Sequence, residues 1–303
     1  MITGNNRRFG GNPEEVTIAG ESAGGASVVM QTVAFGGTAH KFCSDVSNPI
    51  AHDVAGTKAL PFKRAIAQSI GFGPTPTSDE VEAIFKNVSS TVGCTGRNVM
   101  QCLRSAFMGA IVSAINQNTV IPVIDGPGGF LPDLPSRLIA SGKFSNVEFI
   151  GGHCTNDGRT FVVSTPEQFN TEDDTRRFLL TRWSRITMAT MEKAFQLYPA
   201  PDSPGSPFET EYARAAQMFQ DIVYSCMYDS GLHTLLNSLT GVYRDIQLAS
   251  KLTQRGVNGV FTFRWNSPHA AMFERAPFQG VMHTSDLYFL FDGTTRVIYL
   301  PRA

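Results

Sequence analysis

The chain has 303 residues, 42% of them hydrophobic and 17% charged, so it can bury a large core in one large domain or two smaller ones. The 25 Lys and Arg residues nearly balance the 26 Asp and Glu residues, which argues against a basic surface for nucleic acid or anionic membranes. No apolar stretch approaches the roughly 20 residues that span a bilayer, and the opening sequence MITGNNRRFGG lacks the apolar core of a signal peptide. We therefore expect a globular protein without a nucleic-acid partner or a transmembrane segment.

The first predicted unit is a strand, a glycine turn and a helix. The β-branched run at residues 16–19 lies between Pro13 and Gly20 and predicts a buried strand. Residues 23–34 are rich in Ala, Val and Met and predict a buried helix, and this order is typical of an α/β unit. Residues 37–60 have no period and many turn residues, so we expect an irregular insertion there.

The remaining elements follow the same alternation. A helix is expected to begin at Ser78, where acidic residues fill the first turn, and others are expected at residues 97–106 and in a short stretch that ends at Gly142. Residues 171–252 are mostly helical in pattern and predict a helical, cap-like region. The expected strands lie near residues 16, 64, 120, 146 and 259, with helices packed on them. The sequence predicts a doubly wound α/β fold with a mostly parallel sheet.

The five cysteines are Cys43, Cys94, Cys102, Cys154 and Cys226. The short segment from Cys94 to Cys102 either closes as a disulfide in an oxidising compartment or carries two free thiols, and we favour the disulfide. A zinc site is disfavoured because no second pair with matching spacing follows, so no metal is expected. Since five is odd, at least one cysteine is free or lacks its partner in this chain. The pairing of Cys43, Cys154 and Cys226 stays open.

The sequence GESAG at residues 20–24 fits the G-x-S-x-G pattern of a nucleophile elbow. In that motif a sharp turn leaves the serine hydroxyl exposed at the carboxyl edge of a sheet, and Gly20 and Gly24 avoid clashes with the neighbouring strand and helix. The alternative is a glycine turn that only packs a helix on a strand. The strand predicted before the motif and the helix after it favour Ser22 as a nucleophile.

A serine nucleophile needs a base and an acid that orients the base, and in this motif the chain order is serine, acid, histidine. His283 is the best base among six histidines, because it lies in a loop after the last predicted strand. Asp157 lies in the loop after the strand near 146 and is the acid candidate. Taken singly, His283 suits a surface histidine and Asp157 suits an Asn-Asp-Gly turn. Their order at the ends of two strands favours a triad with Ser22.

Several segments, in order from Asn5 to Asp292, resemble the type B carboxylesterase/lipase family, which includes cholinesterases and fungal lipases. They are the elbow region NNRRFGGNPEEVTIAGESAGGASV, the run PFKRAIAQSI, the Cys94 to Cys102 segment with the Leu-Arg after it, the acid-loop runs PVIDGPGGFLPDLPSRLI and GGHCTNDGRTFV, and the histidine loop GVMHTSDLYFLFD. The resemblance implies a single α/β-hydrolase domain.

The resemblance also implies roles for individual residues. By position, Ser22 is the nucleophile, Asp157 the acid and His283 the base. The N–H of Ala23 is an oxyanion-hole donor. Glu21 lies where the family has a buried acid beside the active site, and Gly20 and Gly24 are further supporting residues of the active site. A Cys94–Cys102 disulfide, a secreted location and the absence of a cofactor are implied too. Asp157 is a departure, because the family usually has Glu at that position.

Compared with the family, the chain begins just ahead of the elbow strand and ends soon after the His283 helix. We therefore expect several early strands and a Gly-rich loop that supplies most of the oxyanion hole to be missing. Each lost donor costs about 2.7 to 4 kcal/mol of transition-state stabilisation, so we expect little activity from the 303 residues. The predicted function is hydrolysis of a small-molecule or lipid ester through an acyl-enzyme. The alternative is a catalytically impaired fragment or a non-catalytic binding member of the family.

Overall fold

The computed structural model describes residues 6–38, 60–71, 76, 78–116, 122–162, 165–183, 186–225, 244–269 and 274–291. Most of the insertion expected at residues 37–60 lies outside these residues. Cys43, Cys226 and residues 117–121, where a strand was expected near 120, also lie outside them.

Within the described residues, four parallel strands form the sheet, in the order β1-β2-β3-β4. They are β1 (Thr17–Glu21), β2 (Arg64–Gln68), β3 (Glu148–Cys154) and β4 (Val260–Trp265), so the strands expected near residues 16, 64, 146 and 259 are confirmed. Glu21 pairs in register with Gln68, and Gln68 with Gly152. Because the strands are parallel, all four carboxyl ends meet at one edge of the sheet.

Three helices cover one face of this sheet: α2 (Ala23–Val33), α6 (Pro135–Ala140) and α11 (Arg244–Gln254). Parallel neighbours need crossover connections, and the helices in those connections bury the apolar side chains of the strands. The core between sheet and helices includes Val29, Val33, Phe149, Leu248 and Leu252, all of them almost fully buried. This packing fixes the start of α2 directly behind the carboxyl end of β1.

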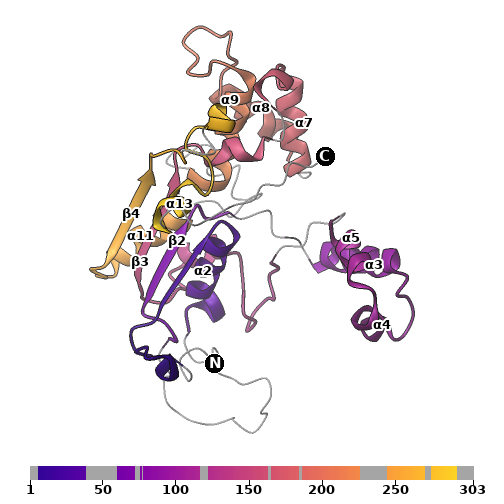
Figure 1. The fold of residues 1–303 in the computed structure, drawn as a ribbon, viewed down its shortest axis with the longest axis vertical. Helices are drawn as coiled ribbons and strands as arrows, with labels where there is room; N and C mark the ends of the chain where they lie inside the picture. The colour runs from indigo at the N-terminus through magenta and orange to yellow at the C-terminus, as the bar shows by residue number, and fades with distance from the viewer. Residues whose placement is uncertain are drawn as a thin grey trace.

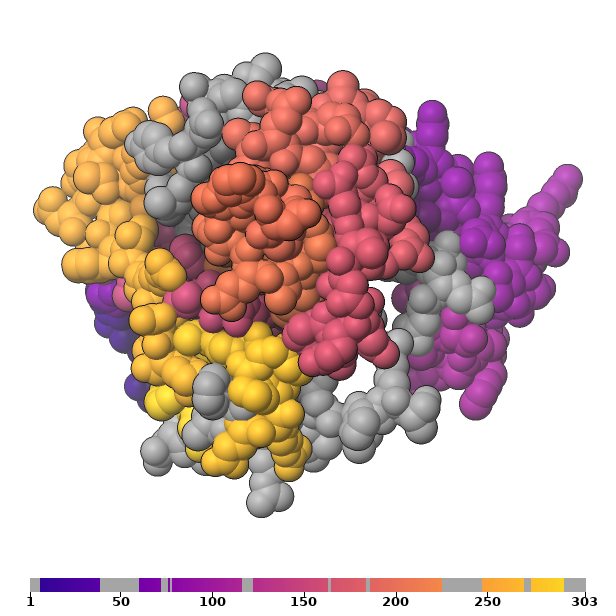
Figure 2. Space-filling view, turned by 90° about the horizontal axis from the view of Figure 1, so that it is seen from above, coloured from indigo at the N-terminus to yellow at the C-terminus, as the bar shows by residue number. Residues whose placement is uncertain are grey.

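A second group of helices lies beyond the carboxyl ends of the strands, toward which β4 points in Figure 1. It consists of α7 (Glu172–Arg182), α8 (Met188–Leu197), α9 (Glu211–Gln220) and the π-helix η6 (Asp221–Ser225), and Figure 2 looks down on it. Their shared core includes Leu179, Met191 and Met218. Arg214, whose side chain is 1% exposed, donates to Glu211 and Glu172 at 2.8 and 3.1 Å and so ties α9 to α7.

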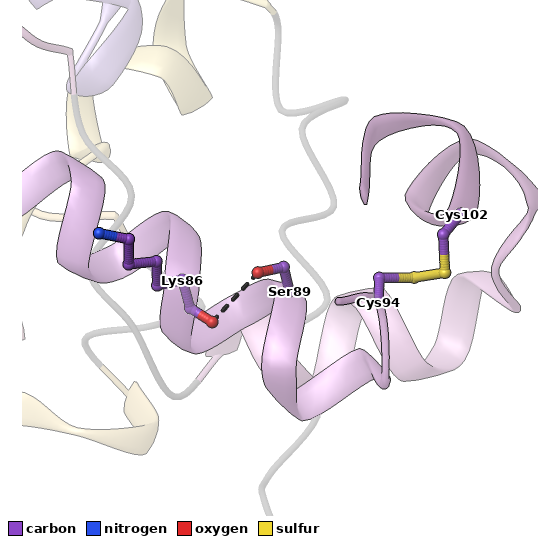
Figure 3. The surroundings of a disulfide bond; sticks show 4 residues. All are labelled: Lys86, Ser89, Cys94 and Cys102. Carbon is purple, nitrogen blue, oxygen red and sulfur yellow. Dashed lines mark hydrogen bonds between the residues drawn. A yellow bond between two sulfur atoms is a disulfide. The ribbon is translucent and has the colours of Figure 1, made fainter. Parts of the chain in front are cut away.

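A third group stands to one side of the sheet in Figure 1 and lies at the right of the view in Figure 2. It contains α3 (Ser78–Val92), α4 (Val99–Ser105) and α5 (Met108–Asn116), and α3 packs against each of the other two. The Cys94–Cys102 disulfide joins the end of α3 to α4 (Figure 3). The helices expected at Ser78 and at residues 97–106 are confirmed, whereas α5 was not predicted from the sequence.

The remaining elements are short: η1 (Arg7–Phe9), η2 (Ala34–Gly36), η4 (Asp157–Phe161), η5 (Pro166–Gln168), η7 (Pro277–Gln279) and α13 (Ser285–Leu290). Two of them matter for the site, because η4 follows β3 and α13 follows the loop that carries His283. None of the helices within the described ranges is long and apolar enough to cross a bilayer.

Candidate functional site

Ser22 occupies the sharp turn between β1 and α2. Its backbone has φ 59° and ψ −120°, a region that side-chain-bearing residues rarely adopt. The conformation is held from both sides, because the Ser22 N–H donates to the carbonyl of Gln68 at 2.9 Å and the Ser22 carbonyl accepts from Gly71 N–H at 3.3 Å. Such strain persists only where surrounding structure enforces it, and it is typical of functional sites.

Close backbone packing explains two glycines of the turn. A Cβ added to Gly20 would lie 2.4 Å from the backbone of Gly24, and a Cβ added to Gly25 would lie 2.6 Å from the carbonyl oxygen of Gln68. At Gly24 an added Cβ meets no atom within 4 Å, although the sequence pattern predicted a close approach there. The contact between helix α2 and strand β2 therefore depends on Gly25, which lies one residue beyond the five-residue motif.

The structure brings Asp157 and His283 together, although 126 positions separate them in the chain. His283 Nδ1 lies 2.6 Å from Oδ1 of Asp157, and both side chains are almost fully buried. Oδ2 of Asp157 accepts from the backbone N–H of Cys154 at 2.8 Å and from the Ser69 hydroxyl at 3.0 Å. The carboxylate is thus fixed at both oxygens. A proton held on Nδ1 by Asp157 leaves the lone pair of Nε2 available to accept another.

The His283 ring contacts two aromatic rings that also contact each other, Phe161 on η4 and Tyr224 on η6, whose centroids lie 5.0 and 5.1 Å away. The backbone N–H of His283 donates to the Thr160 hydroxyl at 3.2 Å. Nearby, the backbone N–H of Val281 donates to the Asn156 side chain at 3.0 Å. This hydrogen bond connects the loop that carries Asn156 and Asp157, called here the acid loop, to the loop that carries His283. These contacts set the direction in which the imidazole points.

Glu21 supplies a second carboxylate to the histidine. Its Oε1 lies 3.1 Å from Nε2 of His283, yet neither atom has a hydrogen bond of good geometry to any described residue. Burial is the largest influence on Glu21 and raises its pKa to about 7, against the opposing charge of His283. Burial alone would lower the pKa of His283, but the hydrogen bond to Asp157 and the charges of Asp157, Glu21 and Asp286 outweigh it and raise the pKa.

Tyr224 brings a hydroxyl to the nucleophile position. A Cβ placed on Gly71 would lie 3.4 Å from the Tyr224 hydroxyl and 3.5 Å from Oγ of Ser22, so the two hydroxyls share one small space. The two side chains interact, and burial raises the pKa of Tyr224, which keeps its hydroxyl neutral. No hydrogen bond joins Ser22 to His283 within the part of the chain that the structure describes.

Asp286 is a buried carboxyl group that contacts strands β2 and β3. Asp286, three residues after His283, accepts from the Gln68 side chain at 2.6 Å and from the thiol of Cys154 at 3.6 Å. Burial raises the pKa of Asp286 and also that of the Cys154 thiol, so this thiol stays protonated. Cys154 is a free, buried cysteine. It acts here as a donor inside the core rather than as an exposed reactive group.

The predicted residues Ser22, Asp157 and His283 therefore lie at the carboxyl edge of the sheet. Several other residues at this edge were missed by sequence reasoning. They are Ser69, Gln220, Tyr224 and Asp286. The short spacing from His283 to Asp286 is a local signal that could have found Asp286, but nothing local pointed to Gln220 or Tyr224. No group of three or more His, Cys, Asp or Glu side chains that could hold a metal ion occurs in the described ranges.

Comparison with known proteins places this site in a family. The profile described as "Carboxylesterase family" matches residues 1–297. Lipase 1 of Geotrichum candidum is 28% identical over 315 aligned positions, covering 95% of this chain and 48% of the lipase. A zebrafish acetylcholinesterase is 31% identical over 182 positions, covering 55% of this chain and 25% of that protein.

A solved structure agrees at the level of the fold. Aspergillus niger EstA superposes with a TM-score of 0.69 at 22% identity, over 96% of this chain and 50% of EstA. The chain thus spans half or less of the length of these matched proteins. With its parallel sheet, flanking helices and strained serine turn, the protein has an α/β-hydrolase fold. It belongs to the carboxylesterase family, a lineage of serine carboxylic ester hydrolases.

Proposed function

We propose that the protein hydrolyses carboxylic esters through Ser22, His283 and Asp157. The observation that carries the proposal is the buried 2.6 Å contact between His283 Nδ1 and Asp157, found at the same edge of the sheet as the strained Ser22 turn. A carboxylate that holds the proton on Nδ1 leaves Nε2 as the base, which is the arrangement that activates a serine hydroxyl.

In the proposed reaction, Ser22 Oγ attacks the ester carbonyl and its proton passes to His283 Nε2. Asp157 keeps the imidazole oriented and stabilises its positive charge. The N–H of Ala23, at the first position of α2, lacks a partner within the helix and can donate to the oxyanion. His283 then protonates the departing alcohol, and water attacks the acyl-enzyme to release the acid and restore Ser22. The steps need no cofactor.

The names of the matched proteins support only a general class of substrate. Matched proteins are named as lipases and as acetylcholinesterases, so we propose a small-molecule or lipid ester and leave the acyl group open. We also propose secretion. Relatives from Arthroderma benhamiae and Gibberella zeae are named as secreted lipases, and the Cys94–Cys102 disulfide suits an oxidising compartment.

The test combines turnover with covalent labelling. Hydrolysis of p-nitrophenyl esters and labelling by a fluorophosphonate are measured for the parent chain, for Ser22→Ala and for Ser27→Ala. Ser27 is the matched control because it lies exposed on α2 and donates to the Ala23 carbonyl. We expect Ser22→Ala to lose the labelling and the turnover that the parent shows, with Ser27→Ala unchanged. Binding of an ester without turnover or labelling in the parent would instead support a non-catalytic member.

A further inference from the structure

Gln220, the last residue of α9, is in direct contact with the loop that carries Asp157. Its side-chain Nε2 donates to the carbonyl of Thr155 at 2.9 Å and to that of Cys154 at 3.3 Å. Its Oε1 accepts from the backbone N–H of Gly158 at 3.2 Å. The residue is 5% exposed. One carboxamide therefore contacts backbone groups on both sides of Asp157.

The helix and the loop approach too closely for other side chains to intervene. A Cβ on Gly158 would lie 2.1 Å from the carbonyl oxygen of Ala216 and 2.9 Å from the backbone nitrogen of Gln220. Within this contact, an amide is needed, because it offers both donors and an acceptor, whereas Leu or Met offers no comparable pair. Without Gln220, the Gly158 N–H and the Cys154 carbonyl would lose a buried hydrogen bond, at a cost of about 1 to 3 kcal/mol each.

The loop that Gln220 holds also sets the direction of the Asp157 carboxylate. The N–H of Cys154 donates to Oδ2 of Asp157 at 2.8 Å, and the other oxygen, Oδ1, meets His283. A shift of the backbone between Cys154 and Gly158 would move both of these contacts together. The orientation of the imidazole thus depends on a side chain that touches neither the imidazole nor Ser22.

We propose that Gln220 is a positioning residue that fixes the acid loop so that Asp157 meets His283 Nδ1. This inference rests on the proposed function, since it assigns a task to Gln220 within the same site. Removing the carboxamide leaves the reacting groups intact and loosens their geometry. Small misplacements of reacting groups cost on the order of 10²-fold in rate.

Gln220→Leu and Gln220→Met are the test variants, and Gln217→Leu is the matched control. Gln217 lies three residues earlier on the same helix, and its side chain donates to Asp221 at 2.8 Å rather than to the acid loop. Met keeps the length and flexibility of the Gln side chain, so it serves if the Leu variant does not fold. Turnover is followed with a p-nitrophenyl ester.

Two readouts report the triad geometry without requiring turnover. They are the pKa of His283 from an NMR titration and the far-downfield Nδ1 proton signal of the His283–Asp157 hydrogen bond, assigned by its loss in His283→Ala. The carboxyl groups that face His283 in the described structure are Asp157, Glu21 and Asp286. Only the Asp157 contact is expected to weaken. Because that contact raises the pKa of His283, the variants should have a lower pKa.

We expect both Gln220 variants to lose about 10²-fold in kcat with little change in KM. They should also lower the pKa of His283 and weaken the Nδ1 proton signal, while Gln217→Leu changes none of these. The proposal is overturned if folded Gln220 variants match the parent in all readouts, or if Gln217→Leu causes the same losses. If the parent chain hydrolyses no ester but the pKa and proton signal respond to Gln220, the proposed function fails while the positioning role stands.

Discussion

Nε2 of His283 lies 3.1 Å from Oε1 of Glu21, the residue directly before Ser22. With Asp157 accepting the proton of Nδ1, a neutral imidazole and an ionised Glu21 would place two acceptors face to face. The contact becomes favourable when one proton lies between them, on either the imidazole or the carboxyl group. Burial raises the pKa of Glu21 to about 7, against the lowering effect of the His283 charge, so Glu21 takes up a proton more readily than an exposed carboxyl group.

Glu21→Gln should change how stability depends on pH. The folded-state pKa of Glu21, about 7, exceeds its ordinary value of 4.5, so the folded state keeps this proton where the unfolded state loses it. The resulting stabilisation is complete below pH 4.5 and disappears as pH rises through 7. As the pH rises from 4.5 to 7, the free energy of unfolding of Glu21→Gln should increase relative to that of the parent by on the order of 2 kcal/mol. Urea unfolding over this pH range measures it.

The control for this measurement is Glu14→Gln, because Glu14 is an exposed acid outside the site. The stability of the Glu14→Gln variant should follow that of the parent across the same pH range. Parallel stability curves for Glu21→Gln and the parent would contradict a raised pKa for Glu21.

Ser22→Gly should stabilise the protein while removing its proposed nucleophile. The φ of 59° costs a serine on the order of 1 kcal/mol or more and costs glycine almost nothing. We expect a gain of about 1 kcal/mol in the free energy of unfolding, together with loss of ester hydrolysis. Denaturant unfolding of Ser22→Gly is compared with that of Ser27→Gly, which lies within α2 and should lose about 0.5 to 1 kcal/mol. Destabilisation by Ser22→Gly would refute stored strain at the turn.

Gly25→Ala should destabilise the protein, whereas Gly24→Ala should not. The methyl group at position 25 would meet the Gln68 carbonyl at 2.6 Å and push α2 away from β2, at a cost of about 1 to 3 kcal/mol. At position 24 nothing lies within 4 Å, so alanine should be neutral or stabilise the helix by up to about 1 kcal/mol. Thermal or urea unfolding of both variants distinguishes them. Equal effects would mean that α2 and β2 are not in close contact at Gly25.

Removing the disulfide should loosen one group of helices and spare the site. Replacing Cys94 and Cys102 by Ser opens a loop with a sequence separation of 8, which we expect to cost about 2 to 3 kcal/mol. Hydrogen exchange should accelerate in α3, α4 and α5, while ester hydrolysis stays unchanged because these helices carry none of the proposed catalytic residues. Treating the parent with dithiothreitol should reproduce the result. Loss of turnover in the variant would show that these helices support the site.

Local patterns were sufficient for much of the fold. The β-branched run before Gly20 and the small-residue run after Ser22 identified β1 and α2, because a strand and a helix impose different periods on apolar residues. The acidic first turn after Ser78 marked the start of α3. The sequence pattern also selected Ser22, and the order of the loops selected Asp157 and His283 as its candidate partners.

Long-range packing decided the rest. No local pattern indicates that Gln220 reaches the Asp157 loop, that Tyr224 faces Ser22, or that Gly25 rather than Gly24 lies against β2. These contacts join segments far apart in the chain, and they exist because strands β1 to β4 end at one edge and a helical group packs across it. The sequence by itself determined the elements and the chemistry of the nucleophile turn. Only the tertiary structure decided which buried groups hold that chemistry in place, because their contacts depend on distance in space and not on spacing along the chain.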